Sequence, residues 1–181
     1  LKARSVAIGH KRLEGDVVRP RKTKGLVIFA HGSGSSRFSP RNTHVAHQLE
    51  VRGFGTLLLD LLTEREAYDR RNVFDIPLLA GRMVEAVRFA RSDAELSSLS
   101  IGLFGASTGA ASALVAAAQL PQEVAAVVSR GGDWLEYEAG EYSAGTDTFQ
   151  YAVVDALGAR ATGSVRVGIA QGPERGGQAK E

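Results

Sequence analysis

The sequence predicts an α/β fold, a three-layer α/β/α sandwich built around a mainly parallel sheet. Segments with helical spacing alternate with short runs that are apolar on both faces, which is typical of strands covered by helices on either side. Strands and helices that alternate in this way form parallel sheets through right-handed crossovers. The four apolar runs span residues 25–30, 56–62, 99–104 and 124–128.

The first part of the chain is expected to hold a strand pair and a helix around the first buried strand. Residues 5–19 have the apolar spacing of two short strands, and their turn is expected near residues 15–16. Further along, Asn42 is expected to cap a helix that continues to Arg52 and stops at Gly53.

The middle of the chain is expected to alternate a loop, two strands and two helices. The charged stretch 63–72 is expected to be a surface loop. Asp75 then caps a helix in which apolar residues recur every three or four positions. The strand at 99–104 leads into an alanine-rich helix that ends near Leu120 and Pro121.

Two regions are expected in the domain organisation. Residues 1–132 should form the folded core, and residues 133–181 a divergent C-terminal segment that is partly irregular or disordered. In the second region only residues 151–154 and 165–169 look strand-like. The glycine-rich stretch 172–181 is expected to be a disordered tail.

Composition excludes several kinds of chemistry. The chain has no cysteine, which excludes disulfides, thiolate metal sites and cysteine nucleophiles. The net charge is +2 and the basic residues are scattered without interleaved aromatics, so nucleic-acid binding is not expected. Apolar runs stay far below the roughly 18–20 residues of a membrane span. A soluble, cytoplasmic protein without membrane contact is therefore expected.

A G-x-S-x-G pattern at residues 105–109 stands directly between a buried strand and a helix. This is the context of a nucleophile elbow, a strained turn that raises a serine above the carboxyl edge of the sheet. Gly105 and Gly109 lack the Cβ atoms that would clash there, and Ser107 is the candidate nucleophile. The alternatives are an ordinary helix-capping serine and a nucleotide-binding turn. Because G-x-G-x-x-G and the phosphate loop are not met, no cofactor is expected.

A second glycine-rich turn, His31-Gly32-Ser33-Gly34, follows the first buried strand. Backbone N–H groups in such a turn can stabilise the oxygen that becomes negative when a serine attacks a carbonyl. The expected donors are the N–H groups of Ser33 and Thr108. A merely flexible glycine turn is the alternative.

Four segments together resemble the α/β-hydrolases, and more narrowly their dienelactone-hydrolase-like branch. The resemblance implies a serine esterase-like hydrolase, without metal or cofactor, that acts on a small ester or acyl substrate through Ser107. Dienelactone hydrolase itself has a cysteine nucleophile, whereas this chain has a serine. The segments that carry the resemblance are residues 30–36, 57–60, 104–111 and 128–132.

The chain departs from that family in its histidines. The family orders its triad as nucleophile, acid and histidine, but all four histidines here lie in the first 47 positions. A serine without an imidazole is not efficiently deprotonated at neutral pH. His31 belongs to the same sheet edge as Ser107, yet it is expected to shape its own turn. His44 and His47 are expected to be a surface pair rather than metal ligands.

Several acidic and basic residues are weaker site candidates. Glu174 stands in the position of the family's acid, and Asp133 follows the fourth buried strand. A solvated carboxylate is the commoner reading of either position. Asp60, at the end of its strand, is expected to line a pocket. Arg130 is expected either to orient an anionic substrate or to pair with a nearby acid.

Two functions follow from these observations. The first is an ester hydrolase that uses Ser107 and turns over weakly as a single chain, because no histidine follows the serine. The alternative is a non-catalytic protein that binds small molecules or partners on a hydrolase-like scaffold. In either case the strand at 124–128 is expected to leave an exposed sheet edge through which a homo-oligomer could form.

Overall fold

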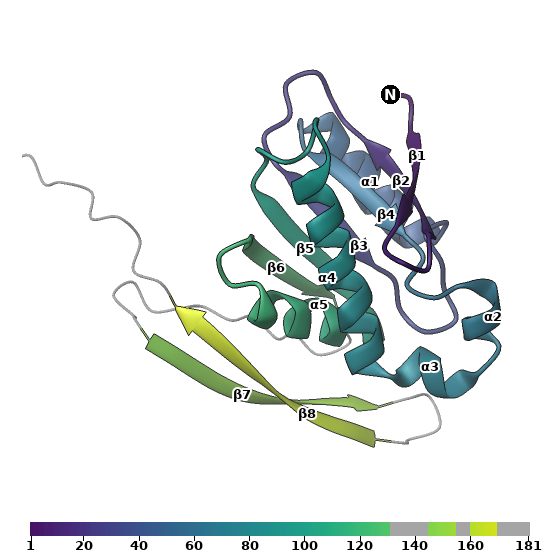
Figure 1. Cartoon of the computed structure of the whole chain (residues 1–181), viewed down its shortest axis with the longest axis vertical. Coiled ribbons are helices and arrows are strands. Elements are labelled where there is room, and N and C mark those ends of the chain that lie inside the picture. The colour runs from purple at the N-terminus through teal and green to yellow at the C-terminus, as the bar shows by residue number, and fades with distance from the viewer. Residues whose placement is uncertain (131–144, 155–159, 170–181) are drawn as a thin grey trace, which may run out of the picture.

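A computed structural model describes residues 1–130, 145–154 and 160–169 of the chain (Figure 1). Six strands form one sheet in the order β1-β2-β4-β3-β5-β6. These strands are β1 (Arg4–Ile8), β2 (Leu13–Val18), β3 (Leu26–Ala30), β4 (Gly55–Leu59), β5 (Ile101–Ala106) and β6 (Val124–Arg130). The helices are α1 (Pro40–Val51), α2 (Glu64–Ala67), α3 (Arg70–Phe74), α4 (Ile76–Ser92) and α5 (Thr108–Gln119).

The sheet is parallel at its centre and lies between two helical layers. β3 pairs in parallel with β4 and β5, and β5 with β6, while β1 and β2 add an antiparallel ribbon at one side. Helix α1 covers one face, and α4 and α5 cover the other (Figure 1). The predicted three-layer α/β/α architecture is therefore confirmed.

The larger part of the core lies between the sheet and helices α4 and α5. Its side chains come from the strands that are apolar on both faces and from the apolar residues that recur along one side of α4. On the other face a smaller cluster forms under α1, where the rings of Phe29 and Phe104 lie 4.9 Å apart. Because side chains fill both faces, the sheet is rigid enough to hold loops at its carboxyl edge in fixed positions.

Two local predictions in the first part of the chain were wrong. The turn between β1 and β2 spans residues 9–12, and Gly15 pairs with Val6 inside the ladder. The alternating burial of β2 explains this, because Gly15 and its neighbours two residues away all face the core. Helix α1 starts at Pro40 and is capped by Ser39, whose hydroxyl accepts the Asn42 N–H. Proline suits the first helical position because its missing N–H is not needed there.

The charged stretch after β4 is helical, so the predicted surface loop at 63–72 was wrong. Thr63 and Glu66 form a capping box that starts α2, and Asp69 accepts the Arg71 N–H at the start of α3. These helices have four and five residues, too few to show an apolar stripe. Their only sequence signal is the capping chemistry at each start.

Beyond the six-stranded sheet, β7 (Gly145–Val154) and β8 (Arg160–Ile169) form a separate antiparallel pair. The two stretches predicted to be strands, 151–154 and 165–169, lie within them. Asp133, Glu174 and the predicted tail lie outside the described residues. The division of the chain at residue 132 stays a prediction.

Strand β6 forms one edge of the main sheet. In the described residues it pairs with β5, and Val128 on it is 52% exposed. Self-association through this edge stays a prediction. Within residues 1–130, 145–154 and 160–169, no helix combines the length and apolar character that crossing a bilayer requires.

Candidate functional site

Ser107 occupies the tip of a strained turn between β5 and α5. Its φ of 55° and ψ of −124° lie in a region that non-glycine residues rarely adopt. The Ser107 N–H donates to the Arg130 carbonyl at 3.2 Å, and the Ser107 carbonyl accepts the Ala110 N–H at 2.9 Å. The side chain is exposed and makes no capping hydrogen bond. The surrounding backbone thus holds Ser107 in a conformation that costs of order 1–3 kcal/mol.

The glycines on either side of Ser107 are required by close backbone contacts. A Cβ atom on Gly105 would lie 2.5 Å from the Ala110 Cα, and one on Gly109 would lie 2.5 Å from the His31 carbonyl oxygen. Such distances are far below van der Waals contact, so only glycine fits either position. The elbow therefore has the backbone spacing that its G-x-S-x-G pattern predicts.

The His31–Gly34 turn lies directly against the elbow. A Cβ atom on Gly32 would lie 3.1 Å from the Ser107 Cβ and 2.9 Å from the Ala106 carbonyl oxygen. The turn is closed by a bond from the Ser35 N–H to the Gly32 carbonyl at 3.2 Å, with Gly34 at a φ of 67°. The structure thus brings together two motifs that are about 75 residues apart in the sequence.

Both candidate oxyanion donors are positioned by this contact. Thr108 begins α5, where the first N–H groups of a helix have no intrahelical acceptor. Among the described residues, the N–H groups of Ser33 and Thr108 donate to no protein acceptor. The positive end of the α5 dipole adds to the attraction for a negative oxygen at this point.

His31 is held by hydrogen bonds at both ring nitrogens. Nε2 accepts the Leu61 N–H at 3.1 Å, so it carries no proton, and Nδ1 donates to the Gly32 carbonyl at 3.0 Å. Burial lowers the pKa of His31 below its ordinary value of 6.5, and the Gly32 bond and the Asp60 charge offset only part of this effect. The neutral ring therefore bridges the Gly32 turn and the loop at Leu61 through hydrogen bonds. The lone pair of Nε2 is engaged by the Leu61 N–H and is not free to take a proton from Ser107.

Acidification from about pH 7.5 to 5.5 is expected to lower the free energy of unfolding through His31. Its pKa is lower in the folded state, so the unfolded chain binds the proton first and stability is lost as the pH falls below 6.5. His31→Gln should remove this contribution to the change of unfolding free energy with pH. His44→Gln, on the exposed surface of α1, should keep it. Urea denaturation across this range measures the slopes; parallel slopes for wild type and His31→Gln would contradict the assignment.

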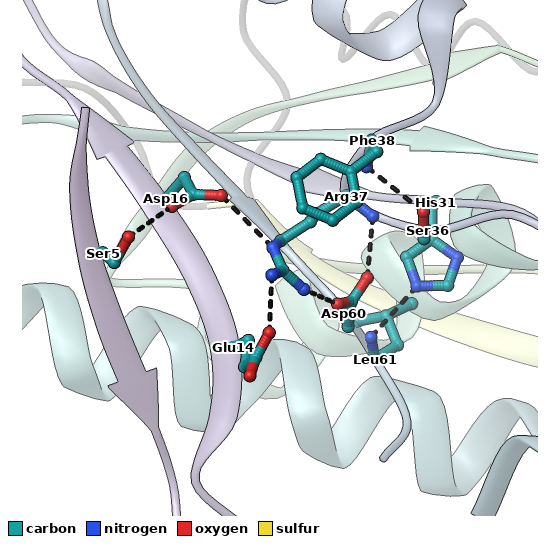
Figure 2. A network of polar contacts seen from close by, with 9 residues as sticks. All are labelled: Ser5, Glu14, Asp16, His31, Ser36, Arg37, Phe38, Asp60 and Leu61. Carbon is teal, nitrogen blue, oxygen red and sulfur yellow. Dashed lines mark hydrogen bonds and ion pairs between the residues drawn. The ribbon is translucent and has the colours of Figure 1, made fainter. Parts of the chain in front are cut away.

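Arg37 is the centre of a network of carboxylates that sequence reasoning missed (Figure 2). Its backbone N–H donates to one oxygen of Asp60 at 2.7 Å, and its guanidinium pairs with the other. The same guanidinium donates to Asp16 at 3.2 Å and to Glu14 at 2.5 Å. Burial works against the charge, but the bonds to Asp60 and Glu14 outweigh it and raise the pKa of Arg37. The network links the glycine turn to β2 and to the residue that follows β4.

A pocket of about 630 Å³ opens beside the glycine turn. Asp60 lies in its wall, as expected, with the His31–Phe38 turn, the α2 region and Thr108. Thr108 is 1% exposed, and its hydroxyl has no hydrogen-bond partner in the described part of the chain. The short helices after β4 also contribute to the lining, through Glu64 and Ala67 of α2 and Val73 of α3.

The remaining candidate residues either lie away from Ser107 or contact it only through a backbone hydrogen bond. His44 and His47 are exposed on α1, and the described residues contain no group of three side chains that could hold a metal ion. His10 in the β1–β2 turn bonds Glu85 at 2.6 Å. Arg130 meets the elbow through its carbonyl oxygen. The two roles expected of its side chain, orienting an anionic substrate or pairing with a nearby acid, stay predictions.

Comparison with proteins of known sequence finds relatives that match most of the chain. Two Mycobacterium tuberculosis proteins, from strains CDC 1551 and H37Rv, are 52% identical to the chain over 127 residues and are described as "putative phosphoribosyl transferase". The match covers 70% of this chain but 29% of each relative. Dividing 127 by 0.29 gives about 440 residues for the whole relative. No protein-family model matches the chain.

Solved structures give the fold. A dienelactone hydrolase from Anabaena variabilis is 50% identical and superposes with a TM-score of 0.68 over 72% of this chain and 62% of its own. Est1E from Butyrivibrio proteoclasticus and an esterase from Pyrococcus furiosus, both 18% identical, have TM-scores of 0.57 and 0.54. They cover 71% and 72% of this chain, and 50% and 48% of their own lengths. With its sheet order and its elbow, this chain has the α/β-hydrolase fold, of the dienelactone-hydrolase-like type.

Proposed function

We propose that this chain carries an acyl-hydrolase site for ester-like substrates, with Ser107 as its nucleophile. The observation that carries the proposal is the exposed Ser107 at a φ of 55° between β5 and α5. A strained backbone at a non-glycine residue persists when the surrounding structure enforces it, and such residues cluster at active sites. The 50% identity to a dienelactone hydrolase supports the hydrolase class.

In this proposal the Ser107 Oγ attacks the ester carbonyl and the N–H groups of Ser33 and Thr108 bind the resulting oxyanion. Collapse of the intermediate releases the alcohol and leaves an acyl-serine, which water then hydrolyses. Removal of the Ser107 hydroxyl proton limits this reaction, because both nitrogens of His31 are engaged and no histidine follows Ser107 in these 181 residues. We therefore expect acylation to be slow and multiple turnover slower.

A fluorophosphonate probe tests the nucleophile without requiring turnover. Ser107 should form an Oγ–P bond with loss of fluoride and a proton, which intact mass detects as one added adduct. Ser107→Ala should lose the adduct entirely. Ser98→Ala, an exposed serine at the opposite end of β5, should label like wild type. Equal labelling of Ser107→Ala and wild type would remove Ser107 from any nucleophilic role.

The second candidate is a non-catalytic binding protein, and the engaged ring of His31 favours it. In that case the pocket holds a small molecule and Ser107 does not react. Ligand-dependent thermal stabilisation with no covalent labelling would be its signature. Adduct formation at Ser107 separates the two candidates.

Phosphoribosyl transfer is not proposed for this chain. That activity is named for relatives of about 440 residues, and the 127 matched residues are 29% of their length. The part of this chain that the structure describes has the fold of hydrolases instead. A cytoplasmic location belongs to the proposal, and cell fractionation tests it.

A further inference from the structure

The part of the pocket wall between β4 and α4 lies outside the core. Every side chain in residues 63–74, which include α2 and α3, is at least partly exposed, and none belongs to either apolar cluster. Burial resumes on both sides of this stretch, since Leu61 is 0% and Ile76 is 5% exposed. A segment that buries no apolar side chain is held to a fold weakly, because burial supplies most of the stabilising free energy. The pocket-lining residues in this stretch are Thr63, Glu64, Ala67 and Val73.

A single side-chain hydrogen bond joins this stretch to the rest of the described chain. Oε1 of Glu66 accepts it from Nη2 of Arg82 on α4, at 2.9 Å. Among the described residues, the other side-chain hydrogen bonds of residues 63–74 have both partners within that range. Since α4 packs against the sheet along its length, the Glu66–Arg82 pair fixes α2 to the rigid part of the molecule.

Glu66 has two roles, one for each of its carboxylate oxygens. Oε2 accepts the Thr63 N–H at 3.0 Å and the Thr63 hydroxyl at 3.1 Å, which completes the capping box at the start of α2. Oε1 binds Arg82. Burial raises the pKa of Glu66, but the bonds from Thr63 and the charge of Arg82 outweigh this effect and lower the pKa overall. The pair is therefore charged at neutral pH, and one side chain both starts α2 and connects it to α4.

Arg82 has a second carboxylate within reach. Its side chain is 5% exposed, and its Nη1 lies 3.5 Å from Oε2 of Glu85, one turn further along α4. In the part of the chain that the structure describes, this oxygen and the Arg82 Nε have no hydrogen-bond partner. His10 in the β1–β2 turn bonds the other Glu85 oxygen at 2.6 Å. A buried guanidinium without a carboxylate is strongly unfavourable, so Glu85 can stabilise Arg82 when Glu66 moves away.

We propose that residues 63–74 form a lid on the pocket and that the Glu66–Arg82 pair is its latch. When the lid is closed, Arg82 binds Glu66. When the lid opens, the guanidinium turns to Glu85, and the capping box and the lining residues of the lid leave their places together. Opening thus removes one part of the pocket wall while the sheet, α4 and the elbow stay folded. The lid does not depend on whether Ser107 is a nucleophile.

Hydrogen exchange, corrected for the intrinsic rate of each amide, measures whether the lid opens by itself. The Ala67 N–H reports the lid because it donates to the Thr63 carbonyl at 3.0 Å. The Leu103 N–H in the middle of β5 reports unfolding of the core. In wild type, Ala67 should be at least about 100-fold less protected than Leu103, and low urea should leave its protection unchanged because the opening exposes little surface. Equal protection of the two amides would mean that the stretch opens only with the whole fold, which would rule out a lid.

Glu66→Gln tests the latch. The new amide keeps a side chain that can cap α2 but lacks the charge that binds Arg82. Ala67 should therefore exchange at least about tenfold faster than in wild type. Glu64→Gln is the matched control, because it makes the same change of charge on the same helix and Glu64 forms no ion pair within the described residues. It should keep the Ala67 exchange rate within about twofold of wild type. Equal Ala67 exchange in the two variants would contradict the latch.

Glu85→Gln is expected to have the opposite effect. The closed lid keeps its bond to Arg82, but the open lid leaves Arg82 without a carboxylate, so opening becomes rarer. Ala67 should exchange at least about threefold more slowly than in wild type. If Glu85 only supported the packing of α4, its neutralisation would leave Ala67 exchange unchanged or make it faster, and either result would overturn the exchange of partners. Because Glu85→Gln leaves the latch intact, it tests the proposal even where Glu66→Gln fails to fold.

Discussion

Gly109→Ala is expected to lower the free energy of unfolding by at least about 3 kcal/mol, the largest effect we expect from a single methyl group in this chain. The new Cβ would lie 2.5 Å from the His31 carbonyl oxygen and closer still to the carbonyl of Ala30. Both obstacles are backbone atoms of the central strand β3 and its turn, which cannot rotate aside. Urea denaturation followed by circular dichroism measures the loss.

Gly102→Ala is the matched control for this prediction. Gly102 lies in β5 three residues before Gly105, but a Cβ there would meet nothing nearer than the Ala126 carbonyl oxygen at 3.7 Å, an ordinary contact. The variant should be nearly as stable as wild type. If Gly109→Ala and Gly102→Ala lose equal stability, the close approach of α5 to β3 is not what requires glycine in the elbow.

Arg37→Met is expected to lower the free energy of unfolding by about 2 kcal/mol at neutral pH. Removal of one member of a buried ion pair costs about 3–5 kcal/mol, and the partial exposure of Asp16 and Glu14 reduces this figure. The variant leaves three carboxylates close together without their cation.

Arg71→Met provides the comparison. Arg71 also pairs with an aspartate, Asp69, at 2.7 Å, but its side chain is 90% exposed. Chemical denaturation of both variants at neutral pH measures the two losses, and the exposed pair should show no measurable loss. A similar loss in both variants would mean that burial of the Arg37 network contributes nothing beyond an ordinary surface ion pair.

The sheet and the elbow could be predicted from the sequence because their signals are local. A strand buried on both faces is a continuous apolar run, as in β3, and the elbow is a five-residue pattern between a strand and a helix. Both depend on neighbouring residues in the chain. The adjacency of the two glycine motifs followed from topology, since parallel strands place their carboxyl ends at one edge.

What could not be predicted depends on contacts between distant residues or on segments too short to show a period. Helices α2 and α3 are shorter than two turns, so their polar residues looked like a loop. The Arg37 network joins residues 14, 16, 37 and 60, which no spacing rule connects. The sequence offers one sign of this network, which is the arginine at position 37 directly after the glycine turn. The burial that lowers the pKa of His31, and the bond from the Leu61 N–H to its Nε2, depend on residues that lie far from it in the sequence.

The carboxylates around Arg37 also give the N-terminal hairpin a part in assembling the site. Glu14 and Asp16 belong to β2, at the side of the sheet, while the turn they help to anchor carries one of the candidate oxyanion donors (Figure 2). A chain that lacks residues 1–18 would keep the elbow and every parallel strand. Arg37 in its turn, however, would lose two of its three carboxylate partners. The hairpin thus helps to hold a turn that carries a candidate oxyanion donor, although none of the candidate site residues lies in the hairpin itself.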